Sequence, residues 1–273
     1  MQFAVIKGRA REIPPIVIVA GTQLTASVSW VVFFVVTGEP FVAPWPAWLA
    51  VVASAVLALA MTALLARASA QGDISIVGPV FALSPIFTVL PDAVLTGTLP
   101  NALGWLGLAL SVAGTASLTG GRIGARRLRT LFARRDALDA LGAAVILGFL
   151  AAVDRWGALV IGPASFLVCS HGTAGVLAAG IIAATMPRTV AHVATPANAV
   201  TLLGYGLLSF VGTGMQTTAL TMAPASYVNA IRRMSAVVAV LLGRALFAEP
   251  ELGRRLAGAV LACAGAACLL LAR

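Results

Sequence analysis

Charged side chains are scarce in this chain of 273 residues. Asp, Glu, Lys and Arg make up 10% of the sequence, whereas hydrophobic residues make up 60% and the mean hydropathy is +1.01. Because a soluble globular protein typically carries about 25% charged residues, this composition excludes a typical water-soluble enzyme. One transmembrane helix needs about 20 apolar residues, so the chain has room for about nine or ten of them, in place of one or two soluble domains.

Cysteine is also rare, and the usual motifs for metals and nucleotides are missing. Cys169, Cys263 and Cys268 lie in apolar runs without a CxxC spacing, so neither a disulfide framework nor a zinc site is expected. Asp136 and Asp139 resemble half of a prenyltransferase metal site but lie at a predicted helix N-terminus, where acids are favoured by the helix dipole. There is no GxxxxGK[ST] loop. We therefore expect no metal, no cofactor and no enzymatic activity.

Long apolar runs place the protein in the all-α class, as a polytopic helical membrane protein. None of the runs alternates between polar and apolar residues as the strands of a membrane barrel do. Charge, glycine or proline separates them into about nine predicted helices, at residues 13–36, 46–67, 74–97, 101–120, 137–155, 163–186, 197–221, 224–247 and 252–271.

An arginine-rich segment divides the chain into two halves. Residues 121–136 hold six arginines, residues 1–120 before them carry four predicted helices, and residues 137–273 after them carry five. We therefore expect two transmembrane repeats and a linker, arranged as four plus five helices and derived from five plus five. The first helix of the first repeat would be missing. A genuine nine-helix variant and a mis-assigned start fit the sequence equally well.

Glycines recur at corresponding positions of the two halves. Gly107 aligns with Gly258, and Gly114 with Gly265, at an offset of 151 residues. The resulting G-x6-G spacings are typical of close helix contacts, either within one chain or between protomers. Since each complete repeat has an odd number of helices, the two halves are expected to be inverted relative to each other. Secondary transporters often carry their site between such inverted repeats.

Residues 74–118 and 225–271 share a further pattern. Each has a helix with a central Pro or Ser, a short turn and a second helix with the G-x6-G spacing. Both stretches resemble the closing helix pair of EamA-type members of the drug/metabolite transporter superfamily. The glutamate of that family's turn is Glu249 here, whereas Thr98 stands at the corresponding place in the first half. The resemblance implies ten helices in two inverted halves, and export or exchange of small metabolites.

Two adjacent arginines are the strongest candidates for contact with a transported molecule. Arg232 and Arg233 lie eight or nine residues into the eighth predicted helix, and a charge near the bilayer centre costs about 2.5–3.5 kcal/mol. A guanidinium donates two parallel hydrogen bonds to a carboxylate or phosphate. We therefore expect an anionic or zwitterionic substrate, with Asn229 on the same stripe of the helix. The alternative is that the arginines only pair with a buried acid, Asp92 or Asp154.

Polar residues on the first and seventh predicted helices are further candidates for substrate binding. In the alternative, such side chains serve only as contacts between packed helices, and Trp30 would be an anchor at the membrane interface. The candidates are Gln23 and Trp30 on the first helix, and Tyr205, Thr213 and Gln216 on the seventh.

Ionisable groups inside the predicted helices are candidates for coupling transport to protons. Asp92 could carry a proton or pair with an arginine, and His171 could change its charge near neutral pH. A histidine that only forms a hydrogen bond to a neighbouring helix is the alternative. Asp154 and Arg155 are placed at the outer end of the fifth predicted helix, where we expect both to be solvated.

These features together predict a secondary transporter, an exporter or exchanger of small polar or amphipathic metabolites that are amino-acid-like or drug-like. It would work by alternating access. An inactive or structural nine-helix protein is the alternative, and a membrane-embedded enzyme a more distant one. The expected partners are a small-molecule substrate and the lipid bilayer. No nucleic acid is expected, and the sequence leaves open whether the protein forms a homodimer. The expected location is the bacterial inner membrane, as a multi-pass protein.

The uneven distribution of arginines gives a topology prediction. Lys and Arg outnumber Asp and Glu 18 to 9, and most of them fall in loops of one side, which the positive-inside rule makes cytoplasmic. We expect the 121–136 linker to be cytoplasmic and the C-terminus to be outside. A reporter enzyme that works only outside the cytoplasm should be inactive when fused at residue 128 and active when fused at residue 273. Activity at residue 128 would reverse the assignment.

Overall fold

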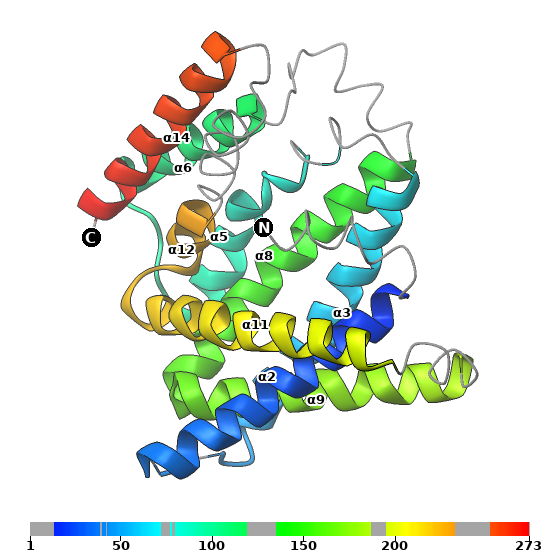
Figure 1. The fold of residues 1–273 in the computed structure, drawn as a ribbon. Coiled ribbons are helices and arrows are strands. Elements are labelled where there is room, and N and C mark those ends of the chain that lie inside the picture. Colours follow the sequence, from blue (N-terminus) through cyan, green and yellow to red (C-terminus); the bar gives the residue numbers. More distant parts are fainter. Residues whose placement is uncertain are drawn as a thin grey trace. The chain divides into compact units, whose positions relative to one another are not determined.

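The computed structural model describes residues 14–38, 40–41, 43–71, 77, 80–118, 135–186, 195–232 and 252–272. Within these ranges the chain forms nine α-helices and no strand (Figure 1). The helices are α2 (Pro15–Thr37), α3 (Ala47–Gln71), α5 (Ser84–Thr96), α6 (Ala102–Leu118), α8 (Arg135–Ile161), α9 (Pro163–Thr185), α11 (Pro196–Met222), α12 (Ala225–Arg232) and α14 (Leu252–Leu271).

Each of the nine predicted helices has a counterpart among the described elements. The fold class predicted from the sequence is therefore confirmed. Two counterparts are shorter than predicted: α5 covers the second part of residues 74–97, and α12 covers the beginning of residues 224–247. Residues 233–251 and most of the 121–136 linker lie outside the described residues.

The lengths and surfaces of the helices fit a polytopic membrane protein. Helices α2, α3, α8 and α9 contain segments long and apolar enough to cross a membrane, and α5, α6 and α14 contain shorter apolar segments. Large apolar side chains such as Val35, Leu90 and Met215 are more than two-thirds exposed. A helix satisfies its own backbone hydrogen bonds, so it can place such side chains in lipid without leaving polar groups unpaired.

The helices pack into two compact units. The first consists of Met1–Leu59 and Asp154–Met222, and the second of Ala60–Val153 and Ala223–Arg273. Each unit thus combines segments from before and after the arginine-rich linker, and α3 and α8 contribute to both units. The division into two sequence repeats was inferred from residue correspondence, and it stays a prediction.

In the first unit, α2 packs against both α9 and α11. On the α9 side, the Ser27 hydroxyl donates a hydrogen bond of 3.2 Å to the carbonyl oxygen of Val168. On the α11 side, Gly206 lies so close to Thr25 that a Cβ at Gly206 would overlap the threonine side chain. Small residues at these crossings let helices approach closely, as they do in other membrane proteins.

In the second unit, α6 and α14 touch through their backbones at the predicted G-x6-G positions. A Cβ at Gly107 would lie 2.9 Å from the carbonyl oxygen of Gly265, and a Cβ at Gly114 would lie 2.6 Å from that of Gly258. The helices are therefore antiparallel, and the predicted close contact occurs within the chain. Under the predicted repeat, Gly107 corresponds to Gly258 and Gly114 to Gly265, so the observed contacts pair each glycine with the predicted equivalent of the other.

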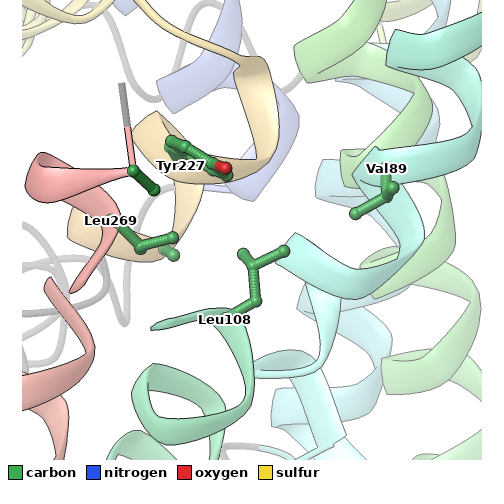
Figure 2. Packing of buried hydrophobic residues seen from close by; sticks show 6 residues of the cluster. Val89, Leu108, Tyr227 and Leu269 are labelled. Carbon is green, nitrogen blue, oxygen red and sulfur yellow. The ribbon is translucent and has the colours of Figure 1, made fainter. Parts of the chain in front are cut away.

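An apolar cluster joins α5, α6, α12 and α14 in the same unit. Figure 2 shows Val89, Leu108, Tyr227 and Leu269 around one centre, and each is at least nine-tenths buried. One side chain comes from each of the four helices. Burial of large side chains contributes most of the packing energy at such a centre, so the cluster fixes the position of α12 relative to α5 and α6.

The predicted helix 74–97 is interrupted before Ser84. Phe81 is helical, Ala82 and Leu83 form a turn, and α5 then begins with Pro85 in its first turn. Proline has no N–H group and its ring obstructs the preceding turn, so a continuous α-helix through this position is disfavoured. The sequence therefore produces a break inside an apolar segment.

Replacement of Gly114 by Ala tests the backbone contact between α6 and α14. The new Cβ would meet backbone atoms of Ala262 and Gly258, which cannot move aside as a side chain can. We expect a loss of about 1–3 kcal/mol, the usual range for overpacking, seen as a lower melting temperature of the detergent-solubilised protein. Gly212→Ala on α11 is the control, because a Cβ there has nothing within 4 Å. Equal melting temperatures of the two variants would contradict the contact.

Candidate functional site

Asp92 on α5 holds the first turn of α12. One carboxylate oxygen accepts the backbone N–H of Ala225 at 2.8 Å, and the other accepts the Thr96 hydroxyl at 3.2 Å. Asp92 is 1% exposed. The free N–H groups and the dipole at a helix N-terminus stabilise an anion there. The structure thus gives Asp92 a position at the start of α12, and its role as a charge partner or proton carrier stays a prediction.

Asn229 makes the next contact between α5 and α12, one turn further along. Its side-chain amide donates to the Thr88 hydroxyl at 3.1 Å, and that hydroxyl donates to the Ser84 carbonyl oxygen at 2.9 Å. Along α12 the contacts run forward from Ala225 to Asn229, whereas along α5 they run backward from Asp92 to Thr88. The two helices are therefore antiparallel. The same register places Arg232 at the level of Pro85, beside the helix break.

Helix α6 provides a third attachment for α12. The Ser111 hydroxyl donates to the carbonyl oxygen of Ala230 at 3.4 Å, and Tyr227 packs so closely on Gly104 that a Cβ there would collide with its hydroxyl. These contacts fix α12 up to its last turn. Arg232 follows there and is exposed, whereas Arg233 lies outside the described residues.

Trp30 on α2 is buried in the first unit, with 7% of its surface exposed. Its ring centroid lies 4.5 Å from that of Phe210 and 5.3 Å from that of Phe33. Its indole Nε1 has no hydrogen-bond partner among the described residues. A buried donor left unpaired costs about 1–3 kcal/mol. The ring is thus packed inside the unit, and both substrate binding and anchoring at the membrane interface stay predictions for Trp30.

The polar stripe of α11 is half-buried in the same unit. Tyr205, Thr213 and Gln216 have intermediate exposure, as does Gln23 on α2. The Thr213 hydroxyl donates to the Ser209 carbonyl oxygen of its own helix at 2.6 Å. These residues therefore belong to the same unit as Trp30, and a role in substrate binding stays a prediction for each of them.

His171 lies on α9 and is 7% exposed. Its Nδ1 atom is 3.0 Å from the carbonyl oxygen of Leu167, four residues earlier on the same helix. This contact fits an Nδ1–H group that donates within the helix, and proton coupling by His171 stays a prediction.

The expectation that Arg155 is solvated is wrong. Helix α8 continues to Ile161, so Arg155 is not at a solvated end, and only 7% of it is exposed. Its Nε donates to the Leu220 carbonyl oxygen at 3.0 Å, near the C-terminus of α11, where a cation is favoured. Asp154 is half-buried and accepts the Ser54 hydroxyl at 2.6 Å. The apolar residues that follow Arg155 were the signal that the helix continues.

A comparison with protein families adds to this geometry. Residues 1–120 match the EamA-like transporter family. The match includes residues 74–118, one of the two stretches on which the predicted resemblance depends, and confirms it there. The family is one of transporters and not of enzymes, and it supports a role as a membrane transporter for this protein.

A solved structure shares the fold of this chain. That structure, described only as "Crystal structure of protein", superposes with a TM-score of 0.78, over 98% of this chain and 93% of the other. The sequence identity is 17%, so the likeness concerns the fold alone. Among curated proteins, no sequence matches this chain.

The described part of the chain offers no evident metal site. Among its described residues, no group of three or more His, Cys, Asp and Glu side chains could hold a metal ion. Asp139, part of the spacing that resembled a prenyltransferase site, forms an ion pair of 3.6 Å with Arg67.

Thr88→Val tests whether the Thr88–Asn229 contact holds α5 and α12 together. Valine keeps the shape but leaves the buried amide of Asn229 without its acceptor, so we expect a loss of about 1 kcal/mol in the free energy of unfolding. Thr185→Val is the control, because the Thr185 hydroxyl bonds to its own helix at an exposed position. Adding Asn229→Leu to Thr88→Val should recover part of the loss in detergent unfolding. Equal effects at positions 88 and 185 would contradict the contact.

Proposed function

We propose that this EamA-like membrane protein is a secondary transporter that exports or exchanges small polar or amphipathic metabolites by alternating access. The observation that carries the proposal is the position of Arg232. Hydrogen bonds from α5 and α6 to Ala225, Asn229 and Ala230 fix α12, and Arg232 follows directly in its last turn. A cation on a fixed helix can recognise a ligand because its position does not have to be ordered on binding.

The chemistry of this cation indicates the class of cargo. A guanidinium matches the geometry of a carboxylate or phosphate through two parallel hydrogen bonds, and Arg233 is next to Arg232 in the sequence. The register between α5 and α12 brings Arg232 to the level of the break before Ser84. Interrupted helices line the substrate sites of many transporters. The cargo is therefore a metabolite with an anionic or zwitterionic group.

Alternating access is supported by the reciprocal contact between α6 and α14, which inverted repeats produce. In this mechanism Gln23, Tyr205, Thr213 and Gln216 are candidate cargo contacts of the first unit. Asn229 is a separate candidate of the second unit. Asp92 and His171 are the groups available for coupling to protons or for charge pairing. The protein works in the bacterial inner membrane, with its arginine-rich linker in the cytoplasm and its C-terminus outside. An inactive, structural role is the alternative.

Replacing Arg232 and Arg233 together by lysine tests this function. Lysine keeps the charge but loses the planar fork, so the half-saturation concentration of an anionic cargo should rise about tenfold, equivalent to about 1.4 kcal/mol. Proteoliposomes loaded with a mixture of amino acids and small carboxylates would release the cargo, identified by mass spectrometry. The melting temperature should not change.

Arg67→Lys is the matched control, because Arg67 is a mostly exposed arginine outside α12. Its half-saturation concentration should equal that of the parent. Release of no compound beyond that of empty liposomes would contradict a transporter. If the parent transports and the double-lysine variant is indistinguishable from it, or fails to fold, the two arginines do not bind the cargo.

A further inference from the structure

Trp30 holds a hydrogen-bond donor that the described fold leaves unused. Its indole Nε1 is shielded from solvent and has no partner among the described residues, and only 7% of the residue is exposed. Buried polar groups in proteins are almost always paired. An unpaired donor in the interior therefore needs a physical reason, such as a ligand that binds in another state.

The surroundings of this donor are aromatic. We define the Trp30 cluster as Trp30 and Phe33 of α2 with Phe210 and Gly214 of α11. The Trp30 ring is tilted by 58° to Phe210 and meets Phe33 edge-on at 69°. A Cβ at Gly214 would lie 2.9 Å from the Trp30 ring, so glycine is what lets the indole lie against the backbone of α11. Flat apolar walls with one polar group are typical of small-molecule sites.

The cluster lies at the contact between α2 and α11. At the neighbouring crossing, Gly206 of α11 packs on Thr25 of α2. In alternating access, groups that are closed in one state line the pathway in another. Because the indole N–H is shielded from solvent, a ligand acceptor atom reaches it only if α2 and α11 move apart.

We propose that the Trp30 cluster binds the flat apolar part of the cargo and that the Trp30 indole N–H donates a hydrogen bond to an oxygen atom of it. The cargo class is thus an amphipathic molecule with an aromatic or other flat body and a carboxylate or carbonyl oxygen. This inference rests on the proposed transport function and specifies its substrate. The described structure is the state in which the cluster is closed.

A contact of the indole N–H with the face of Phe33 or Phe210 is the competing explanation, since such contacts are weakly favourable. It makes a different prediction. A contact of this kind would stabilise the folded protein, and its loss would lower the melting temperature without changing any affinity. The site proposed here would instead respond to a ligand.

Two probe molecules distinguish a site that needs a hydrogen-bond acceptor in the ligand from a site that needs only an aromatic ring. Benzoate has a ring and a carboxylate, whereas benzylammonium has the same ring and no acceptor. In the whole chain labelled with 5-fluorotryptophan, the fluorine resonance of Trp30 should shift with benzoate and stay in place with benzylammonium. The other four tryptophans allow its assignment through single Trp→Phe variants, even if Trp30→Phe fails to fold.

Trp30→Phe keeps an aromatic ring but removes the donor together with part of the indole ring system, so the affinity for benzoate should fall about tenfold. Trp45→Phe is the matched control, because Trp45 is 86% exposed, and it should bind benzoate like the parent. A Trp30 resonance that ignores benzoate, or equal affinities of the two variants, would overturn the site. If proteoliposomes with the parent protein release nothing while the Trp30 resonance still responds to benzoate, the proposed transport function is wrong and the Trp30 binding site stands.

Discussion

The hydrogen bond between the Asp92 carboxylate and the Ala225 N–H group determines where α12 begins. An isolated helix of this length is not stable by itself, because nucleation of the first turn is unfavourable. The buried carboxylate offsets that nucleation cost by accepting one of the N–H groups that have no partner within the helix. The contacts of Asn229 and Ala230 then follow at helical spacing. The position of Arg232 thus depends on an acid two turns away along the helix axis.

The turn before α12 is bounded by two buried charges of opposite sign. Helix α11 ends at Met222, and Arg155 binds the Leu220 carbonyl oxygen near that end. Helix α12 begins at Ala225, where Asp92 binds the backbone N–H. Each charge matches the sign that the helix dipole requires at its end. Each contact lies within its own compact unit, so the helix ends on both sides of this turn are held by charge as well as by packing.

Most of the fold could be predicted from the sequence, because long apolar runs and the breaks between them depend on local composition. The G-x6-G spacings also predicted close helix contacts for α6 and α14, since only glycine allows such an approach of two backbones, but the sequence left open whether the contacts lie within the chain. The burial of Arg155 could not be predicted, because its partner is a backbone carbonyl 65 residues away. For the same reason, the sequence showed that Asp92 was unusual but did not reveal that its partner is the start of a helix.

The candidate site was predicted only at the level of residue types. The sequence identified Trp30, Asn229 and Arg232 as polar groups in apolar surroundings, which needs no knowledge of their neighbours. It could not reveal that Asn229 bonds to Thr88, or that the Trp30 indole has no partner among the described residues, because both facts depend on which helices lie side by side. Helix pairing is a property of the whole chain, and local patterns do not determine it.

The reciprocal glycine contact has a consequence for how such a chain could have arisen. In an ancestral pair of identical half-length chains, inserted in opposite directions, the equivalents of Gly107 and Gly114 would occur twice in one interface. A single codon change would then have altered the interface at two places at once. If the predicted repeats arose by duplication and fusion, Gly107 and Gly258 came to belong to separate codons, as did Gly114 and Gly265. Each half of such a gene would then tolerate changes that the ancestral gene could not.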